Sequence, residues 1–223
     1  MPALRALSLL EARVLGVLVE KSRTVPDSYP LSLNALTLGC NQKTARDPVL
    51  SALEAEVQDA VDALKSLSLA FEASGSRVTR FEHNMARVLA LPSQSVALLA
   101  VLMLRGPQTA SELRTNAERL HRFADLSSVE AFLVELAERS AEKGGALVTR
   151  VPRAAGAREP RWAHLLCGAV AASAATLAVD AQDFVAASEI AALRANQTVM
   201  QAELAHLREL VEHLYAELGV ARG

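Results

Sequence analysis

The sequence has few aromatic residues and almost no net charge. Aromatic side chains make up 4% of its 223 residues, although apolar residues as a whole make up 51%. The core is therefore expected to be aliphatic, and a composition rich in alanine and leucine favours helix over sheet. The net charge of −2 at pH 7 provides no general attraction for nucleic acid or for acidic lipid.

Long hydrophobic runs and cysteine motifs are also missing. Leu165–Val179 is a long stretch without a charged residue, and it is too short to span a membrane. Near the N-terminus, Glu11 interrupts the apolar residues before a signal-peptide core can form. Cys40 and Cys167 stand far apart and outside any CxxC pattern, which excludes a disulfide framework and is typical of a reducing compartment. We expect a cytoplasmic protein that does not enter a membrane.

The residue patterns of enzymes and metal sites are not found either. The sequence has no phosphate-binding glycine loop, no nucleophile beside a base and no paired carboxylates. None of its scattered histidines has a second ligand at zinc-like spacing, so packed or solvated side chains are expected. These histidines are His83, His121, His164, His206 and His213. We therefore expect no enzymatic activity, no metal and no cofactor.

What the sequence does contain is a series of clear helix starts. In four places a serine or threonine precedes a glutamate by three residues. This is the pattern of a capping box, in which each side chain accepts a hydrogen bond from the other residue's backbone N–H. The pairs are Ser8 with Glu11, Ser51 with Glu54, Thr109 with Glu112 and Ser127 with Glu130. Apolar residues at helical spacing follow, so amphipathic helices are predicted.

The order of these elements repeats along the chain. Residues 14–18 resemble residues 98–102, and a basic residue, Lys21 or Arg105, closes each of the two helices. Further matches follow in the same order: Leu36 with Leu113, then Val57, Val61 and Leu64 with Val129, Leu133 and Leu136, then residues 80–83 with residues 161–164. This common order indicates an internal duplication.

Each copy of the repeat ends in a predicted β-hairpin. Residues 69–72 and 77–83 flank a Ser-Gly-Ser turn, and residues 146–151 and 161–166 flank a longer loop. Three helices followed by a hairpin is the plan of the winged helix, a variant of helix-turn-helix. We therefore predict a mainly α fold with small β-hairpins, of the α+β class, with two tandem winged-helix domains. These domains span residues 1–88 and 89–167.

A third module is predicted after an Ala-rich linker at residues 168–181. Within residues 182–223, apolar residues and one glutamine occupy positions a and d of about four heptads. They are Ile190, Leu193, Gln197, Met200, Leu204, Leu207, Val211, Leu214 and Leu218. This narrow stripe predicts a coiled coil that joins two chains into a homodimer. The alternative is an amphipathic helix that packs back onto its own chain.

Several short motifs between residues 8 and 166 are quite specific. They are EARVLG at 11–16 followed by Glu20-Lys21, YPLSLN at 29–34, CNQKT at 40–44 with RDPV at 46–49, RVTR at 77–80, LRG at 104–106, and Arg158-Glu159 with Arg161 and His164. Together they resemble the YceH-like family of uncharacterised bacterial proteins. The resemblance implies a tandem winged-helix fold and no particular activity. The chain departs from the family pattern at Ala45, where a polar residue is usual.

The charges on the predicted third helices argue against insertion into a DNA groove. In a DNA-reading winged helix, the third helix enters the major groove. Carboxylates on its outer face would repel phosphates and release no counterions. The carboxylates are Glu54, Glu56, Asp59 and Asp62 on helix 54–67 and Glu130, Glu135 and Glu138 on helix 127–139, against Lys65 and Arg139.

The other basic residues stand in the loops and hairpins instead. Arginines on a wing suit contacts with phosphates or with a narrow minor groove, which position a protein on DNA without reading much sequence. The predicted nucleic-acid-binding residues are Lys43, Arg46, Arg77, Arg80, Arg150, Arg153, Arg158 and Arg161. The alternative is that they are ordinary solvated charges, with Arg46 paired to Asp47.

Two functions therefore stay open at the level of sequence. The first is a dimeric, regulator-like DNA-binding protein that uses the wing arginines. The second is a protein–protein interaction scaffold that uses the acidic third helices and the coiled coil, an interpretation that rests on analogy between folds. We favour DNA binding because it is the commoner role of this fold, so the expected partners are DNA or a protein, together with a second copy of the chain.

Overall fold

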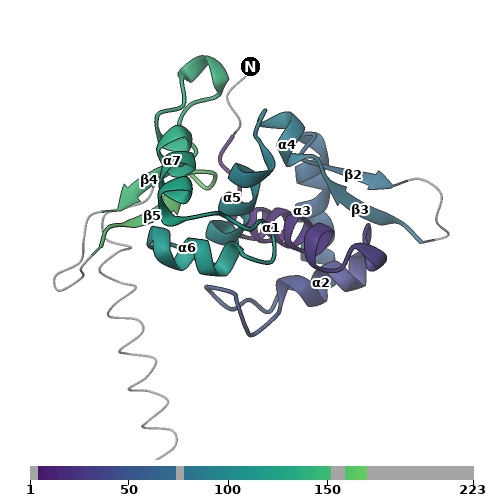
Figure 1. Cartoon of the computed structure of the whole chain (residues 1–223). Coiled ribbons are helices and arrows are strands. Elements are labelled where there is room, and N and C mark those ends of the chain that lie inside the picture. The colour runs from purple at the N-terminus through teal and green to yellow at the C-terminus, as the bar shows by residue number, and fades with distance from the viewer. Residues whose placement is uncertain (1–4, 74–77, 152–158, 170–223) are drawn as a thin grey trace, which may run out of the picture. The chain divides into compact units, whose positions relative to one another are not determined.

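The computed structural model describes residues 5–73, 78–151 and 159–169, which belong to one compact unit, Met1–Ala172 (Figure 1). Several residues named above lie outside the described residues, namely Arg77, Arg153 and Arg158, the linker beyond residue 169 and the predicted coiled coil from Ile190 to Leu218. The predictions made for them stay predictions.

The first half of the unit combines three main helices with a three-stranded sheet. Its elements are α1 (Leu9–Thr24), η1 (Pro26–Ser28), β1 (Leu31–Ser32), α2 (Leu33–Cys40), α3 (Glu54–Ser66), β2 (Ala70–Ala73) and β3 (Arg80–His83). The strands are antiparallel in the order β1-β3-β2, and Phe81 of β3 pairs with Leu31 on one side and Glu72 on the other. The short helix α4 (Met85–Val88) leads into the second half.

The second half repeats this order with a reduced sheet. Its elements are α5 (Ser93–Arg105), α6 (Ala110–Ala117), α7 (Leu126–Ala137), η2 (Ala141–Lys143), β4 (Val148–Val151) and β5 (Arg161–His164). The strands β4 and β5 pair antiparallel, and Gln108 forms a single antiparallel bridge with Trp162 of β5. Gln108 thus stands where β1 stands in the first half.

This architecture agrees with the predicted class and with the predicted duplication. Seven α-helices and two small antiparallel sheets make up the described part of the chain, and hairpins occur in both predicted places. The matched residues are also buried alike. Leu36 and Leu113 are both 0% exposed, and Phe81 and Trp162 are 1% and 3% exposed.

Two of the four predicted capping boxes are confirmed. At the start of α1, Ser8 Oγ accepts the Glu11 N–H at 3.1 Å, and the Glu11 carboxylate accepts the Ser8 N–H at 2.8 Å. Thr109 and Glu112 do the same at the start of α6, at 3.2 and 2.8 Å. Here the residue pattern alone located the helix ends correctly.

The other two predicted boxes, at Ser51 and Ser127, are wrong by two residues. Asn41 bonds both the N–H and the carbonyl of Ala52 at 2.8 Å, which keeps the chain extended there, so α3 begins only after Leu53. The Asp125 carboxylate accepts the Ser128 N–H at 2.7 Å and takes the role predicted for Ser127. An ionised acceptor forms the stronger cap.

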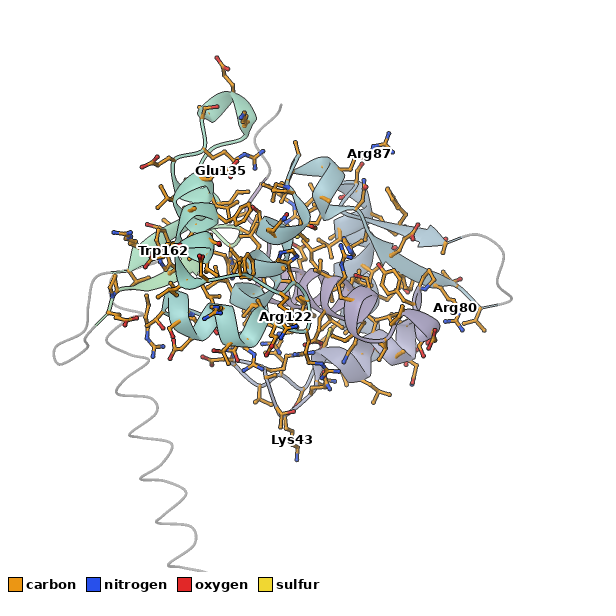
Figure 2. All side chains as sticks on the ribbon, in the orientation of Figure 1. Lys43, Arg80, Arg87, Arg122, Glu135 and Trp162 are labelled. Atoms are coloured by element: carbon orange, nitrogen blue, oxygen red, sulfur yellow. The ribbon has the colours of Figure 1, made fainter. Side chains whose placement is uncertain are left out.

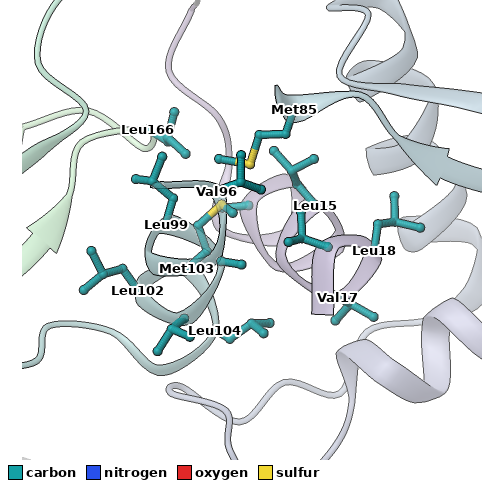
Figure 3. Close-up of a cluster of buried hydrophobic side chains, with 14 of the residues drawn as sticks. Leu15, Val17, Leu18, Met85, Val96, Leu99, Leu102, Met103, Leu104 and Leu166 are labelled. Carbon is teal, nitrogen blue, oxygen red and sulfur yellow. The ribbon is translucent and has the colours of Figure 1, made fainter. Parts of the chain in front are cut away.

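The helices α1 and α5 pack against each other in the middle of the unit (Figure 3). Every residue of Glu11–Val19 and of Ser95–Leu104 is buried. A surface helix buries one face only, whereas α1 is also covered by α2 and α3, and α5 by α6 and α7. The two predicted domains therefore share one hydrophobic core.

Each hairpin packs against one helix of this pair, β3 against α1 and β5 against α5. The ribbon shows β2 and β3 on one side of the α1–α5 pair and β4 and β5 on the opposite side (Figure 1). Residues on the two hairpins therefore belong to two separate surfaces.

Candidate functional site on the hairpins and loops

In each half, an arginine of the hairpin donates a hydrogen bond to a backbone carbonyl shortly before the second helix. Arg80 Nη1 donates to the Pro30 carbonyl at 2.8 Å, and Arg161 Nη1 donates to the Pro107 carbonyl at 3.0 Å. Each proline precedes the residue that pairs with the hairpin, Leu31 or Gln108. The same contact in both halves points to a shared structural role, which leaves part of each guanidinium for other partners.

The second hairpin presents two positive charges to solvent. Arg150 is exposed, and its guanidinium carbon lies 4.8 Å from the centre of the buried Trp162 ring, a cation–π contact. Arg161 is exposed as well, with Nη2 3.5 Å from Glu112 Oε1. That pair is half exposed and therefore weak, so neither arginine is neutralised by a strong partner.

Lys43 lies in the loop between α2 and α3 and points away from the protein (Figure 2). It is exposed, and its side chain has no hydrogen bond or ion pair within the described residues. Among the residues predicted to bind nucleic acid, Lys43, Arg150 and Arg161 are thus the described ones that face solvent, while Arg80 is half-buried.

Arg46 does not fit the prediction that it binds nucleic acid, and the alternative pairing with Asp47 is wrong too. Its side chain is 0% exposed, and its guanidinium holds Glu20 through both carboxylate oxygens at 3.2 and 2.7 Å. The remaining N–H groups donate to Gly39, Ala45 and Gln42. Because all five N–H groups are used, Arg46 has none left for a phosphate.

The buried pair sets the charge state of Glu20. Burial alone would raise the pKa of its carboxyl, but the hydrogen bonds and charge of Arg46, assisted by Lys21, outweigh burial and hold that pKa below its ordinary value. Glu20 is therefore ionised near neutral pH and balances the charge of Arg46.

The rest of the RDPV motif joins the two halves of the unit. The Asp47 N–H donates to the carbonyl of Leu104 at the end of α5, at 2.8 Å. The Pro48 carbonyl accepts from Arg13 of α1 at 2.6 Å, and Arg13 also donates to the Cys40 carbonyl at 3.1 Å. Arg13 is 0% exposed. No role was predicted for this residue, although its place inside an apolar helical run is a sign of a buried charge.

The outer faces of α3 and α7 are acidic, as predicted. Glu56, Asp59 and Asp62 are exposed on α3, and Glu130, Glu135 and Glu138 are exposed on or next to α7. Lys65, the one basic residue of α3, contacts both Asp62 and Glu72. Hydrogen bonds from Gln58 and Lys65 lower the pKa of Asp62, so the face stays negative.

An exposed apolar group beside α3 was not predicted. Leu53 is 70% exposed, Leu38 on α2 is 66% exposed, and Val49 in the loop between α2 and α3 is 54% exposed. Large apolar side chains that stay exposed mark an interaction surface when they form a patch. Nothing in the helical periodicity distinguishes them from buried leucines.

The histidines of the hairpins are packed, and their imidazoles stay neutral. His83 and His164 occupy matching positions, and each has an Nδ1 that is buried without a hydrogen-bond partner. Burial lowers the pKa of each imidazole to about 4. Among the residues that the structure describes, no group of three His, Cys, Asp or Glu side chains is placed to hold a metal ion. In the same residues, no helix is both long and apolar enough to cross a membrane.

Comparison with known proteins places this fold in a family. The model of a family described as "Protein of unknown function, DUF480" matches residues 7–158. The chain belongs to the DUF480 family. Members of this family that carry the name UPF0502 protein match nearly the whole chain, and the YceH-like resemblance found in the sequence is consistent with this family.

Three of these relatives are bacterial UPF0502 proteins. One from Burkholderia pseudomallei is 63% identical over 222 residues, covering 100% of this chain and 93% of its own length. One from Burkholderia thailandensis is 63% identical, covering 98% and 92%. One from Cupriavidus taiwanensis is 59% identical, covering 99% and 90%. The names of these relatives state no activity.

Proposed function

We propose that this DUF480 member is a non-enzymatic, tandem winged-helix protein that binds the phosphate backbone of DNA as a homodimer. Three helices followed by a hairpin, with a third strand or bridge from the residue before the second helix, occur in each half. This order supports assignment of both halves as winged helices.

The distribution of solvent-facing charge carries the proposal. Lys43, Arg150 and Arg161 face solvent from a loop and a hairpin, whereas α3 and α7 turn carboxylates outward. Insertion of either third helix into a groove would bring carboxylates against phosphates. Contacts from loop and hairpin cations avoid this repulsion, and they bind many sequences with similar affinity because they reach phosphates rather than base edges.

Binding to a short DNA duplex at several salt concentrations tests the proposal. The double variant Arg150→Gln, Arg161→Gln should weaken binding on unrelated sequences alike and reduce the slope of log affinity against log salt by about one for each phosphate that the variant no longer binds. Arg87→Gln, a change at an exposed arginine of α4 (Figure 2), is the matched control and should leave the slope unchanged. Absence of binding at low salt, or equal binding by the double variant, would contradict the proposal.

The homodimer rests on the heptad pattern of residues 190–218. Sedimentation of the full chain should give the mass of two chains. Leu204→Lys with Leu207→Lys, which puts charges at neighbouring a and d positions, should give one chain. A homodimer of this chain would hold four winged helices together on one DNA duplex. A wild-type monomer at micromolar concentration would contradict both the homodimer and this joint binding.

The exposed leucines favour a second candidate, a protein-docking function of the first half. Leu38, Val49 and Leu53 lie at or before the start of the acidic helix α3, a combination of apolar and negative groups that suits a basic, partly apolar protein surface. Leu38→Ser with Leu53→Ser should abolish recovery of a stoichiometric partner and leave DNA binding intact. Recovery of no stoichiometric partner with the wild-type chain would remove this candidate.

A further inference from the structure

A pocket lies where the two halves of the unit meet, away from both hairpins. Its volume is about 230 Å³. Its walls come from the last turns of α1 and α5, the loop after α2, and the end of α6 with the residues that follow it. Lys21 and Arg105, the basic residues that close the two matching helices, both line it, and Arg119 lines it from beyond α6.

Positive charge is in excess in this pocket. Four cationic side chains and a single carboxylate line it, and these are Lys21, Arg46, Arg105, Arg119 and Glu20. Both oxygens of the carboxylate are held by Arg46, so Glu20 already has its partner. Asp47 and Glu118 are close in sequence to the lining residues but do not line the pocket.

The pocket also contains donors that the protein itself does not use. Within the described residues, the guanidinium groups of Arg105 and Arg119 have no hydrogen bond or ion pair. Lys21 Nζ contacts Gln42 Oε1 at 3.3 Å and Glu20 Oε2 at 3.4 Å, which leaves one of its three N–H groups without a partner. The side chain of Lys21 is 22% exposed, so its ammonium group is partly withdrawn from water.

The partial negative charges of helix C-termini offset part of the positive charge of the pocket but not all of it. The C-terminal ends of α1, α5 and α6 lie at the pocket, and each carries a partial charge of about −0.5 that basic residues stabilise. Three such ends offset about half of the net charge of +3 that the four cationic side chains and Glu20 give the pocket. A net positive potential therefore remains in this pocket.

We propose that this pocket binds a small phosphorylated molecule through Lys21, Arg105 and Arg119. Guanidinium groups match the geometry of phosphate oxygens, and two of them with an ammonium group suit a doubly negative phosphate. The volume lies below the range of roughly 300–1,000 Å³ that is typical for drug-sized ligands, so the ligand carries little beyond its phosphate group. Because the pocket joins the two halves, a ligand there would also stabilise their contact.

Calorimetric titration of the full chain with inorganic phosphate, in a low-salt buffer without other polyvalent anions, tests this inference. Wild-type protein should bind phosphate and melt several degrees higher when saturated than with chloride at equal ionic strength. Arg105→Gln and Arg119→Gln should each weaken phosphate binding about tenfold or more. Arg87→Gln is the control and should bind like the wild type. Circular dichroism checks that each variant is folded.

Two results would overturn the inference. The first is no phosphate binding by the wild type, and the second is unchanged binding by folded Arg105→Gln and Arg119→Gln. If the first result comes with a loss of affinity of these two variants for a DNA duplex, the pocket residues contact the phosphates of nucleic acid instead of a small molecule. Failure of DNA binding through Arg150 and Arg161 would leave the phosphate result standing, because those residues do not line the pocket.

Discussion

At the scale of single residues, the buried charges explain why the motif residues are needed. Arg46 makes its full set of hydrogen bonds inside the protein, and Glu20 is its anionic partner. A buried pair of this kind is costly to break, because the remaining charge is left without a partner in a poorly solvated place. Arg46, one of the two basic residues of the loop between α2 and α3 that were predicted to bind DNA, is therefore a structural residue.

Replacing Glu20 should destabilise the protein strongly. We expect Glu20→Ala to lower the free energy of unfolding by about 3 kcal/mol, since it leaves the Arg46 charge unpaired. The exposed Glu118→Ala should change it by less than about 0.5 kcal/mol. Denaturant unfolding followed by circular dichroism measures both values. Equal and small losses in the free energy of unfolding for Glu20→Ala and Glu118→Ala would show that the Glu20–Arg46 pair contributes little to stability.

The two hairpin histidines predict a loss of stability in mild acid. Their folded pKa of about 4 lies below the ordinary value of 6.5, so the unfolded chain binds protons more readily than the folded one. Their contribution is complete above pH 6.5 and is lost as the pH falls from 6.5 towards 4, by roughly 1–3 kcal/mol for each histidine. The lowered pKa of Glu20 acts in the same direction but only below its ordinary value of 4.5.

Unfolding in denaturant at a series of pH values between 7.5 and 4.5 checks this prediction. The wild type should lose stability steadily below pH 6.5, and His83→Gln with His164→Gln should have a flatter profile. A wild-type profile that is flat over this range would show that the imidazoles are accessible to protons in the folded protein.

At the scale of elements, the loop between α2 and α3 decides both the site and the helix boundary. Asn41 holds Ala52 extended, Asp47 bonds the end of α5, and Pro48 accepts from Arg13. These contacts are distant in sequence. The local pattern located the capping boxes at Ser8 and Thr109, where neighbours in the chain supply both partners. It failed at Ser51, because Asn41 bonds Ala52 from eleven residues away.

Gly39 in α2 is required by the close approach of α1. A Cβ atom at this position would lie 2.6 Å from Cγ1 of Val17. Although alanine favours helix over glycine, Gly39→Ala should therefore destabilise the protein, by about 1–3 kcal/mol. Asn34→Ala, on the exposed face of the same helix, should change stability little. Thermal unfolding of both variants checks this, and a Gly39→Ala protein more stable than the wild type would contradict the packing described.

At the scale of the whole unit, the repeat was predictable and the shared core was not. The order of matched residues gave two copies with a hairpin each, and the burial of Leu36 and Leu113 agrees with it. Sequence could not place one copy against the other, because packing between α1 and α5 depends on shape. A sign was present nonetheless. Residues 14–19 and 96–104 are apolar almost without interruption, which is typical of helices buried on every side.

The candidate site followed the sequence only in part. The acidic faces of α3 and α7 and the exposed arginines of the second hairpin were predicted from charge and periodicity alone. The burial of Arg46 and the pocket between the halves were not, since both bring together residues from distant elements. A charged residue whose partner is distant in sequence cannot be placed correctly from the residues next to it in the chain.

The separation of the hairpins and the presence of the pocket both require that the two halves form one folding unit around α1 and α5. Hydrogen exchange of the full chain in increasing denaturant tests it most directly. We predict that the amides of α1 and α5 lose protection together, and that Leu98→Ala in α5 lowers the protection of both helices equally. Protection of α1 that is kept while that of α5 is lost would contradict the shared core.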